Sequence, residues 1–524
     1  MEPRRHKETL PGGPALGIQA TVKFLLVRPH VFLKVAKRFH AFLHLEPLDL
    51  ELVAAGIDPS HDTRILDLTL SDDPVAAFEE AVRRLEPDVI GFGGYSNQAG
   101  NVKDLARRAK RLRQQTRILV GGVHATIVPA DYHLPGVIDL VIRGEGATAM
   151  RTLVPLLAAG QPIPASERFL PTDAPDYATL AAMPPPPLPD YAGLPWPRRD
   201  LVDRSRYFCV WAGEPGERVR TLFPRTATLR TSTGCPHRCN FCVVHHLANG
   251  KYLQREPEDV VAEIAAVPED HIYFVDDEMF INAARAETMA RLLLERGVRK
   301  HYISWARSDT IVRHPDLFRL WKQAGLEVVY VGMESMEEQN LAEYRKGYAP
   351  DVNRQAVAIL RDLGIILHAA LMVNPDFTAE DFLKVRRSIE AVAPAEVSFT
   401  VFSPPPGTPL WAQYKDRYIC PDPYAFYDCM HTLLPTRVPL ATFYRYFSLL
   451  YLFGFRHNPW RARDIRAPWR DVAHMVVSGI RCGDALRTIY RNTTENCGTP
   501  WARNHEHNSS IASRPAGASA GLPG

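Results

Sequence analysis

Three cysteines and three histidines fall within sixteen residues of this chain, in the stretch TSTGCPHRCNFCVVHH. Cys235, Cys239 and Cys242 have the spacing C-x3-C-x2-C and directly follow an apolar, strand-like segment. Two kinds of metal centre use such ligands. A structural zinc site needs four protein ligands, and His245 or His246 could supply the fourth. A [4Fe–4S] cluster held by three thiolates instead leaves one iron open to a substrate or cosubstrate.

The spacing of the ligands favours the iron–sulfur cluster. No second C-x2-C or H-x3-H pair follows at a distance that suits a zinc knuckle. A zinc loop would also leave unexplained the long series of strand and helix patterns that begins just before the cysteines. We therefore predict that the three cysteines hold a [4Fe–4S] cluster with one open iron and that the two histidines lie outside the ligand set.

The motif GCPHRCNFC resembles the signature of the radical S-adenosylmethionine superfamily. The resemblance implies that the open iron chelates the amino and carboxylate groups of S-adenosylmethionine, whose reductive cleavage yields a 5′-deoxyadenosyl radical. It also implies that Phe241, just before the last cysteine, packs near the adenine. The segments FVDDEMF, SWARSD and VGMES match further contacts of that family to the amino group, carboxylate and ribose. The residues concerned are Asp276, Asp277, Arg307, Glu334 and Ser335. For the three carboxylates among them, the alternative is that they cap helices at strand ends.

The cysteines lie within a series of six strand patterns that alternate with helices over residues 223–405. The strand patterns are residues 226–233, 271–277, 302–306, 327–334, 366–373 and 396–404. Pro257 and Pro315 suit first helical positions, and Gly325 and Gly364 suit helix C-termini. Six such repeats predict a partial (β/α)6 barrel with its site at the carboxyl ends of the strands, where the cysteines lie.

Residues 21–160 show a separate alternation of five apolar strands with amphipathic helices, for example at 73–85 and 99–113. Near-continuous apolar strands predict a parallel, doubly wound (Rossmann-like) sheet. Glycines follow the later strands, where such sheets bind ligands: Gly93, Gly94, Gly121, Gly122, Gly144 and Gly146. No G-x-G-x-x-G follows the first strand and no P-loop is present, which argues against a plain nucleotide-binding domain.

The segments GFGGYSNQAG, ILVGGVHATIVP and DLVIRGEGATA resemble the cobalamin-binding fold that is fused to class B radical S-adenosylmethionine methyltransferases and related cyclases. The cobalamin contacts that this resemblance implies are Ser96, Gly121, Gly122, Gly144 and Glu145. The stretch DYHLPG, with His133, matches the D-x-H-x-x-G motif whose histidine replaces the lower cobalt ligand. That motif belongs after the first strand, however, and this copy follows the fourth. The loop after the first strand lacks the motif, although His30 lies nearby. We expect no protein histidine on cobalt.

The remaining segments are expected to connect or extend these two domains. Residues 161–222 form a proline-rich, mostly extended linker, and the aromatic-rich residues 406–490 form a mostly helical region. Within it, 443–455 is either an amphipathic face that rests on a membrane or a buried core helix. The tails at 1–20 and 491–524 are expected to be disordered.

The composition fits a folded protein of two or three domains. The chain has 524 residues, 46% of them hydrophobic and 23% charged, and a net charge of +3 without a basic stripe, which gives no sign of a nucleic-acid partner. Eight cysteines are too few and too clustered for a disulfide framework, so we expect a cytoplasmic protein, with peripheral contact at the inner membrane face as an option. No run of 18 apolar residues is present. The cysteines expected to be free thiols are Cys209, Cys420, Cys429, Cys482 and Cys497.

Three further segments are similar to hopanoid C-3 methyltransferases. They are residues 25–57 near the start of the first domain, VVHHLANGKY and DCMHTLLPTRVPLATFYRYF. The similarity extends over about residues 21–490. It implies methyl transfer to an unactivated carbon, C-3 of ring A of a pentacyclic triterpenoid, with an external electron donor of the flavodoxin or ferredoxin type. One alternative is a radical enzyme with the same cofactors that methylates or oxidatively cyclises another substrate. The other is a non-catalytic cobalamin or metal sensor with a zinc-stabilised loop.

Overall fold

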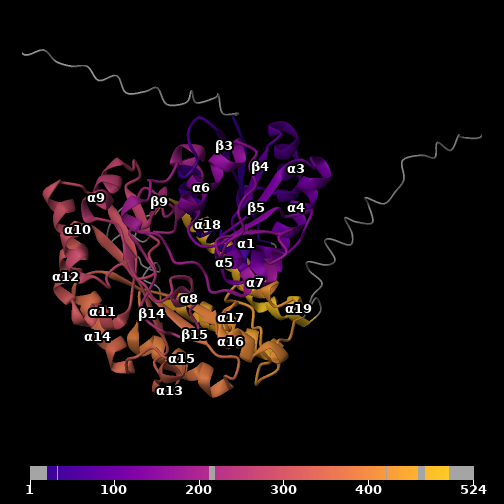
Figure 1. The fold of residues 1–524 in the computed structure, drawn as a ribbon. Coiled ribbons are helices and arrows are strands. Elements are labelled where there is room, and N and C mark those ends of the chain that lie inside the picture. Colours follow the sequence, from indigo (N-terminus) through magenta and orange to yellow (C-terminus); the bar gives the residue numbers. More distant parts are fainter. Residues whose placement is uncertain (1–20, 32, 212–218, 421, 458–466, 495–524) are drawn as a thin grey trace, which may run out of the picture.

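Two six-stranded sheets, each built mainly from parallel strand–helix repeats, carry the fold (Figure 1). The structure, a computed structural model, describes residues 21–31, 33–211, 219–420, 422–457 and 467–494. Of the expected tails 1–20 and 491–524, residues 1–20 and 495–524 lie outside the described residues, whereas 491–494 belong to a helix, α19 (Ile489–Thr494). The predicted fold class, a doubly wound domain followed by a partial barrel and a mostly helical C-terminal region, is confirmed.

The first sheet has the strand order β3-β1-β4-β5-β6-β7. Its five parallel strands are those expected from the sequence: β1 (Lys23–Arg28), β3 (Asp62–Asp67), β4 (Val89–Phe92), β5 (Arg117–Val120) and β6 (Leu140–Ile142). Helices α3 (Pro74–Leu85) and α4 (Ala99–Leu112) contribute to the core on one face, and α2 (Leu48–Ala55) and α6 (Gly146–Ala158) to the core on the other. The chain reverses its direction of growth between β1 and β4, which is where ligands bind in such sheets.

The second sheet is an open barrel whose six parallel strands follow one another in chain order. They are β9 (Thr226–Leu229), β12 (His271–Phe274), β13 (His301–Ala306), β14 (Leu326–Glu334), β15 (Ile366–Val373) and β16 (Glu396–Val401). The helices around it are α9 (Pro257–Ala266), α10 (Ala283–Glu295), α11 (Ser308–Arg313), α12 (Pro315–Ala324), α13 (Glu338–Glu343), α14 (Pro350–Asp362) and α15 (Ala379–Val392). As predicted, Pro257 and Pro315 open α9 and α12, and Gly325 ends α12 with a φ of 117°.

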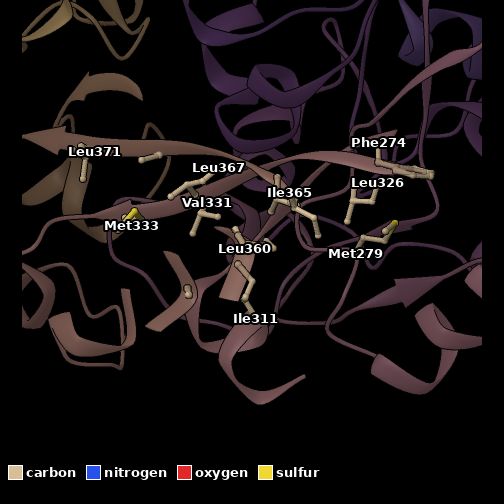
Figure 2. Close-up of a cluster of buried hydrophobic side chains, with 14 of the residues drawn as sticks. Phe274, Met279, Ile311, Leu326, Val331, Met333, Leu360, Ile365, Leu367 and Leu371 are labelled. Carbon is tan, nitrogen blue, oxygen red and sulfur yellow. The ribbon is translucent and has the colours of Figure 1, made fainter. Parts of the chain in front are cut away.

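The main core lies between the outer face of this sheet and its helices (Figure 2). Phe274 of β12, Val331 of β14 and Leu367 of β15 belong to one cluster of buried side chains with Ile311 of α11 and Leu360 of α14. Burial of each such side chain contributes roughly 1.5–3 kcal/mol. This packing fixes where the strands end, and thus where the barrel rim lies.

Aromatic rings fill the inner side of the barrel. Tyr330 stacks on Trp305 at 4.8 Å and on His368 at 3.9 Å between ring centroids, and Tyr273 lies 6.0 Å from Tyr330. Because the interior is filled by side chains, ligands bind at the rim of the barrel.

The segment expected to be an extended linker is more ordered than the sequence predicts. Strand β7 (Phe169–Pro171), in the expected linker, adds an antiparallel edge to the first sheet, and α7 (Tyr177–Ala182) follows it. Also in that stretch, β8 (Phe208–Cys209) pairs with β2 (Leu43–His44). Buried apolar residues between the prolines, such as Leu170 and Tyr177, account for this order. The limits assigned to the linker stay predictions.

The C-terminal region contains α16 (Pro409–Gln413), α17 (Leu440–His457), α18 (Trp469–Arg487) and α19 (Ile489–Thr494). Helix α17 packs on β16 and α15, and α18 packs on α17 and on α1 (Lys34–Phe39). The inner face of α17 is buried through Phe443, Tyr444, Phe447 and Leu450, as expected of a core helix. Among the described residues, no helix is long and apolar enough to span a bilayer.

Candidate active site between the two sheets

A cavity of about 790 Å³ lies between the carboxyl ends of the two sheets. The glycines expected to approach a ligand all line it: Gly93, Gly94, Gly121, Gly122, Gly144 and Gly146. The barrel side contributes Arg230, Gly234 and Asp277, and the C-terminal region contributes Tyr427 and Cys429. Of the site residues predicted on the barrel, Asp277 therefore faces the same cavity as the glycines.

The glycines on the first sheet form a close-packed backbone surface. Gly122 has a φ of 92°, and a Cβ added there would lie only 2.6 Å from the backbone nitrogen of Gly94. Gly144 also has a positive φ, 84°. Such a surface admits a large flat ligand close to the backbone, as cobalamin requires.

Ser96 and Glu145, the two polar residues predicted on this side, line the cavity but are engaged within the protein. The Glu145 carboxylate accepts hydrogen bonds from the backbone nitrogens of Ala147 (2.6 Å) and Thr148 (2.7 Å) and so caps α6. The Ser96 hydroxyl is 3.0 Å from Nδ1 of His124, a fully buried ring. Both residues therefore help to fix the shape of the cavity.

His124 also links the site to the DYHLPG motif, through its aspartate. The other ring nitrogen of His124 lies 3.1 Å from the Asp131 carboxylate, to which Lys103 donates at 2.9 Å. Burial opposes ionisation of Asp131, but the hydrogen bond from His124 and the Lys103 charge hold its pKa below the usual value. His124 lies in the segment ILVGGVHATIVP, but spacing in the sequence does not show that this histidine pairs with Ser96.

The histidine of that motif points elsewhere. His133 Nε2 lies 3.0 Å from the carbonyl oxygen of Thr172, and its ring stacks on Tyr177 at 4.2 Å. Among the described residues that line the cavity, neither His133 nor His30 is present. His133 is thus engaged by Thr172 and Tyr177, and the absence of a protein histidine on cobalt stays a prediction.

The three cysteines lie in the loop between β10 (Ser232–Thr233) and α8 (Val244–Leu247), at the barrel rim. Burial raises the pKa of Cys235 to about 11 and that of Cys242 to about 12. Arg307 Nη1 lies 3.6 Å from the Cys239 sulfur and brings a positive charge to the site. Iron binding would replace the thiol protons, and this positive charge favours the thiolates.

The zinc alternative finds no support in this geometry. In the parts of the chain that the structure describes, no three His, Cys, Asp or Glu side chains lie close enough to hold one metal ion. A zinc site needs four ligands on one ion, whereas in a cubane each thiolate binds a different iron. In and around α8, Val243, Val244 and Leu247 line the cavity, whereas His245 and His246 do not.

Two of the acidic residues predicted to contact S-adenosylmethionine hold the loop that leads into the cysteines. Asp276 is buried and accepts hydrogen bonds from the backbone nitrogen (3.1 Å) and hydroxyl (2.8 Å) of Thr231. Asp277 accepts from the backbone nitrogen of Gly234 at 2.7 Å and also lines the cavity. Burial raises the pKa of both carboxyls. The helix-capping alternative does not hold for them, because Asn282 caps the helix that follows.

Glu278, the next residue, has a free carboxylate oxygen. One oxygen accepts from the backbone nitrogen of Arg307 at 2.6 Å, and Oε1 is buried without a partner. Burial raises the pKa of Glu278 to about 8. Three consecutive acids marked this segment in the sequence, but the side chain with an open acceptor is the third.

Arg307, Glu334 and Phe241 meet around Lys346, a residue that no motif in the sequence marks. The Lys346 ammonium donates to the Glu334 carboxylate at 2.9 Å and lies 5.7 Å from the centre of the Phe241 ring, and its carbonyl accepts from Arg307 at 2.6 Å. Glu334 has a φ of 59°, at a register shift between β14 and β15. Strained backbone of this kind is concentrated at functional sites.

Ser335 is turned away from this group. Its hydroxyl accepts hydrogen bonds from the backbone nitrogen of Glu337 (3.0 Å) and from the Asn340 side chain (3.2 Å). Phe241 packs edge-on against Tyr344 at 5.9 Å. The structure thus brings Phe241, Arg307 and Glu334 together beside Cys239 and places the Ser335 hydroxyl in the following turn.

Among the described residues, the cysteines outside the motif form no disulfide. Cys209, Cys420 and Cys482 are buried in apolar clusters, whereas Cys429 lines the cavity with a φ of 61°. Cys497 lies outside the described residues.

Comparisons with known proteins agree with this architecture. Residues 229–389 match the radical SAM superfamily and residues 40–154 match the B12 binding domain. A hopanoid C-3 methylase from Methylococcus capsulatus is 32% identical over 77% of this chain and 75% of its own length. A hopanoid C-2 methylase from Rhodopseudomonas palustris is 23% identical over 73% of this chain and 68% of its own.

Solved structures show the same fold. The radical S-adenosylmethionine methyltransferase TsrM from Kitasatospora setae, with tryptophan substrate and a SAM analogue bound, superposes with a TM-score of 0.57. The match covers 94% of this chain and all of that one, at 17% identity. The cofactors are therefore a [4Fe–4S] cluster, S-adenosylmethionine and cobalamin, and the chain belongs to the cobalamin-binding radical S-adenosylmethionine methyltransferases.

Proposed function

We propose that this enzyme transfers a methyl group to C-3 of ring A of a hopanoid lipid. The observation that carries the proposal is the 32% identity to the Methylococcus capsulatus C-3 methylase over three quarters of both chains. The hopanoid C-2 methylase is 23% identical over a similar span. The nearest alternative is therefore methylation of the same class of lipid at a different ring carbon.

The residues of the barrel rim are suited to hold the cluster and S-adenosylmethionine. Cys235, Cys239 and Cys242 supply three thiolates, and the free acceptor of Glu278 suits a protonated amino group. The Arg307 guanidinium is suited to a carboxylate. Phe241 offers an apolar ring to a purine, and we assign Asp276 and Asp277 mainly to positioning the cysteine loop, through Thr231 and Gly234.

The opposite wall of the cavity is suited to cobalamin through the glycine backbone and the Ser96–His124 pair. When bound, the cluster with S-adenosylmethionine supplies a hydrogen-abstracting radical and cobalamin supplies the methyl group. The protein orients the reactants and excludes water between the two sheets. An external one-electron donor of the flavodoxin or ferredoxin type completes the system.

Apolar side chains make up part of the cavity lining. Leu188, Leu194, Leu247 and Val275 line the cavity together with Tyr427. An apolar wall with a few aromatic rings suits a flat polycyclic hydrocarbon. An unactivated ring carbon offers no acidic proton to a base, which is consistent with the radical route.

Lipid profiling tests the substrate. The gene is expressed in a bacterium that makes hopanoids without a methyl group at C-3, and Cys239→Ala is expressed as the matched inactive control. We expect 3-methylhopanoids only with the intact enzyme. A 2-methyl product, or an unchanged hopanoid profile in cells that contain active enzyme, would refute C-3 methylation and leave the enzyme class in place.

Anaerobic reconstitution tests the chemistry separately. The loaded enzyme, with a reduced flavodoxin or ferredoxin, is expected to form 5′-deoxyadenosine, and the Cys239→Ala variant is not. If the enzyme turns over with a chemical reductant but with neither flavodoxin nor ferredoxin, the assigned class of electron donor is wrong.

A further inference from the structure

Exposed apolar side chains are concentrated on the two long C-terminal helices. Of the thirteen large apolar side chains that are exposed among the described residues, seven belong to α17 and α18. Two, Leu449 and Leu452, lie on α17; the five on α18 are Trp469, Val472, Val476, Val477 and Ile480. Ile480 is 69% exposed and Trp469 is 74% exposed, values more typical of charged residues.

The five residues on α18 form one continuous face. With 3.6 residues per turn, positions 469, 472, 476, 477 and 480 fall within a sector of about 140° around the helix. The face runs from the first residue of the helix over three turns. An exposed apolar face of this kind marks a site of interaction.

The opposite face of α18 fixes the helix to the body of the protein. Ser478, Cys482, Ala485 and Leu486 are buried there. The Asp471 carboxylate accepts from the backbone nitrogen of Leu222 at 2.7 Å. Because this side is anchored, the apolar side is presented outward.

The charge around this face indicates what it binds. Residues 467–491, which include α18, hold four arginines, two aspartates and no lysine or glutamate. Arg470 and Arg481 are exposed on α18 and fall at one border of the apolar sector. Apolar side chains bordered by arginines, with a tryptophan at one end, are typical of helices that lie in the interface of an anionic bilayer. The net positive charge disfavours a second copy of the same surface as the partner.

We propose that the apolar face of α18 docks this enzyme on the surface of a membrane that contains anionic lipid. In this arrangement the helix lies parallel to the bilayer, its apolar side chains enter the boundary of the acyl chains, and Arg470 and Arg481 contact lipid phosphates. The face differs from the one that the sequence suggested at 443–455, whose inner side is buried in the core.

The position of α18 connects this surface to the cavity. Helix α18 packs on α1, as Figure 1 shows, and Ala36 and His40 at the other side of α1 line the cavity. Helix α1 therefore contacts α18 and also contributes to the cavity lining through Ala36. If the proposed lipid substrate is correct, the enzyme meets it where it resides; the docking itself does not depend on that substrate.

Vesicle flotation with the full-length, cluster-loaded enzyme tests the proposal. The probes are vesicles of phosphatidylcholine alone and vesicles of phosphatidylcholine with an equal amount of phosphatidylglycerol. We expect binding to the anionic vesicles that weakens as salt is added. The double variant Trp469→Ser, Ile480→Ser should bind at least about tenfold more weakly, because two large apolar side chains no longer enter the bilayer.

Charge reversal provides a second variant with a separate signature. Arg470→Glu with Arg481→Glu should weaken binding to anionic vesicles by roughly fivefold or more per residue and leave the weak binding to phosphatidylcholine unchanged. Leu383→Ser, at a 43% exposed apolar side chain on α15, is the matched control and should bind like the wild type. Cluster absorbance and 5′-deoxyadenosine formation should be equal in all variants.

The proposal is overturned if the wild-type enzyme does not float with anionic vesicles, or if the α18 variants float as well as Leu383→Ser. It is also overturned if sedimentation shows a dimer that the Trp469→Ser, Ile480→Ser variant loses, because the face then binds a second copy. None of these outcomes bears on the hopanoid product, which is measured separately.

Discussion

Replacing Gly122 with alanine tests whether the glycine surface of the first sheet is the cobalamin wall. Gly122 has a φ of 92° and a ψ of −169°, a region that other residues occupy at a cost of about 1–3 kcal/mol. The new Cβ would lie 2.6 Å from the Gly94 nitrogen, so the two segments must separate by roughly 0.8 Å to reach the 3.4 Å of ordinary contact. Such overpacking costs about 1–3 kcal/mol more.

Both Gly94 and Gly122 line the cavity, so this shift changes the surface that meets the ligand. We expect the Kd for cobalamin to rise at least about tenfold, or about 1.4 kcal/mol. Gly136→Ala is the matched control: Gly136 has a φ of 80°, lies outside the cavity lining and has open space where the Cβ would be. Anaerobic titration with hydroxocobalamin, followed by absorbance, measures both variants, and thermal unfolding measures their stability.

The two variants should both be less stable than the wild type, but only Gly122→Ala should lose affinity. Equal cobalamin affinity in Gly122→Ala and Gly136→Ala would refute the assignment of this wall. A loss of affinity in both would show that stability, and not the shape of the cavity, controls binding.

Three further predictions concern buried charges and the rejected histidine. Burial, together with the charge of nearby Glu46, raises the pKa of Glu51 to about 8, above its ordinary value. Because the folded state then holds this proton more tightly than the unfolded state, the unfolding free energy should fall as pH rises from about 5 to 8. Glu51→Gln should flatten that decline in a denaturant titration, and an unchanged slope would contradict the burial argument. Lys346→Met should cost about 3–5 kcal/mol of unfolding free energy, since it leaves the Glu334 carboxylate buried without its partner. The double variant Lys346→Met, Glu334→Gln should recover at least half of that loss. If it recovers none, the two side chains are not coupled. His133→Ala should leave the absorption spectrum of bound cobalamin unchanged, and loss of an imidazole-ligated spectrum would place His133 on cobalt.

The parts of the site that motifs mark could be predicted from the sequence. The cysteine spacing and the glycines after successive strands identify residues whose position follows from the strand order alone, because the carboxyl ends of parallel strands share one edge. Phe241 and Arg307 belong to this group. Each lies next to a motif or at a strand end, and both are found beside Cys239.

Residues that reach the site through long-range packing could not be predicted. Lys346 follows a short helix without a motif, and only the return of its loop toward the cysteines places it on Glu334. Glu278 could not be separated from its two acidic neighbours, since side-chain directions at a strand end depend on the loop that follows. His124 pairs with Ser96 from another strand–helix connection, and sequence spacing carries no information about such a pair.

The same limit explains the two C-terminal helices. Both have apolar residues at helical spacing, and the sequence cannot tell which helix buries its apolar face. Phe443 and Phe447 of α17 pack on the barrel, whereas Val476 and Ile480 of α18 stay exposed because the other side of that helix is the one that packs.

Transfer of a labelled methyl group tests the central assignment most directly. The reconstituted enzyme is incubated anaerobically with a hopanoid, S-adenosylmethionine that carries a trideuterated methyl group, cobalamin and a protein electron donor, and the lipid is analysed by mass spectrometry. We predict a hopanoid with a trideuteromethyl group at C-3, formed together with 5′-deoxyadenosine and absent with the Cys239→Ala variant. Formation of 5′-deoxyadenosine without any labelled hopanoid would contradict the assignment of the substrate, and neither product from fully loaded enzyme would contradict the account of the site.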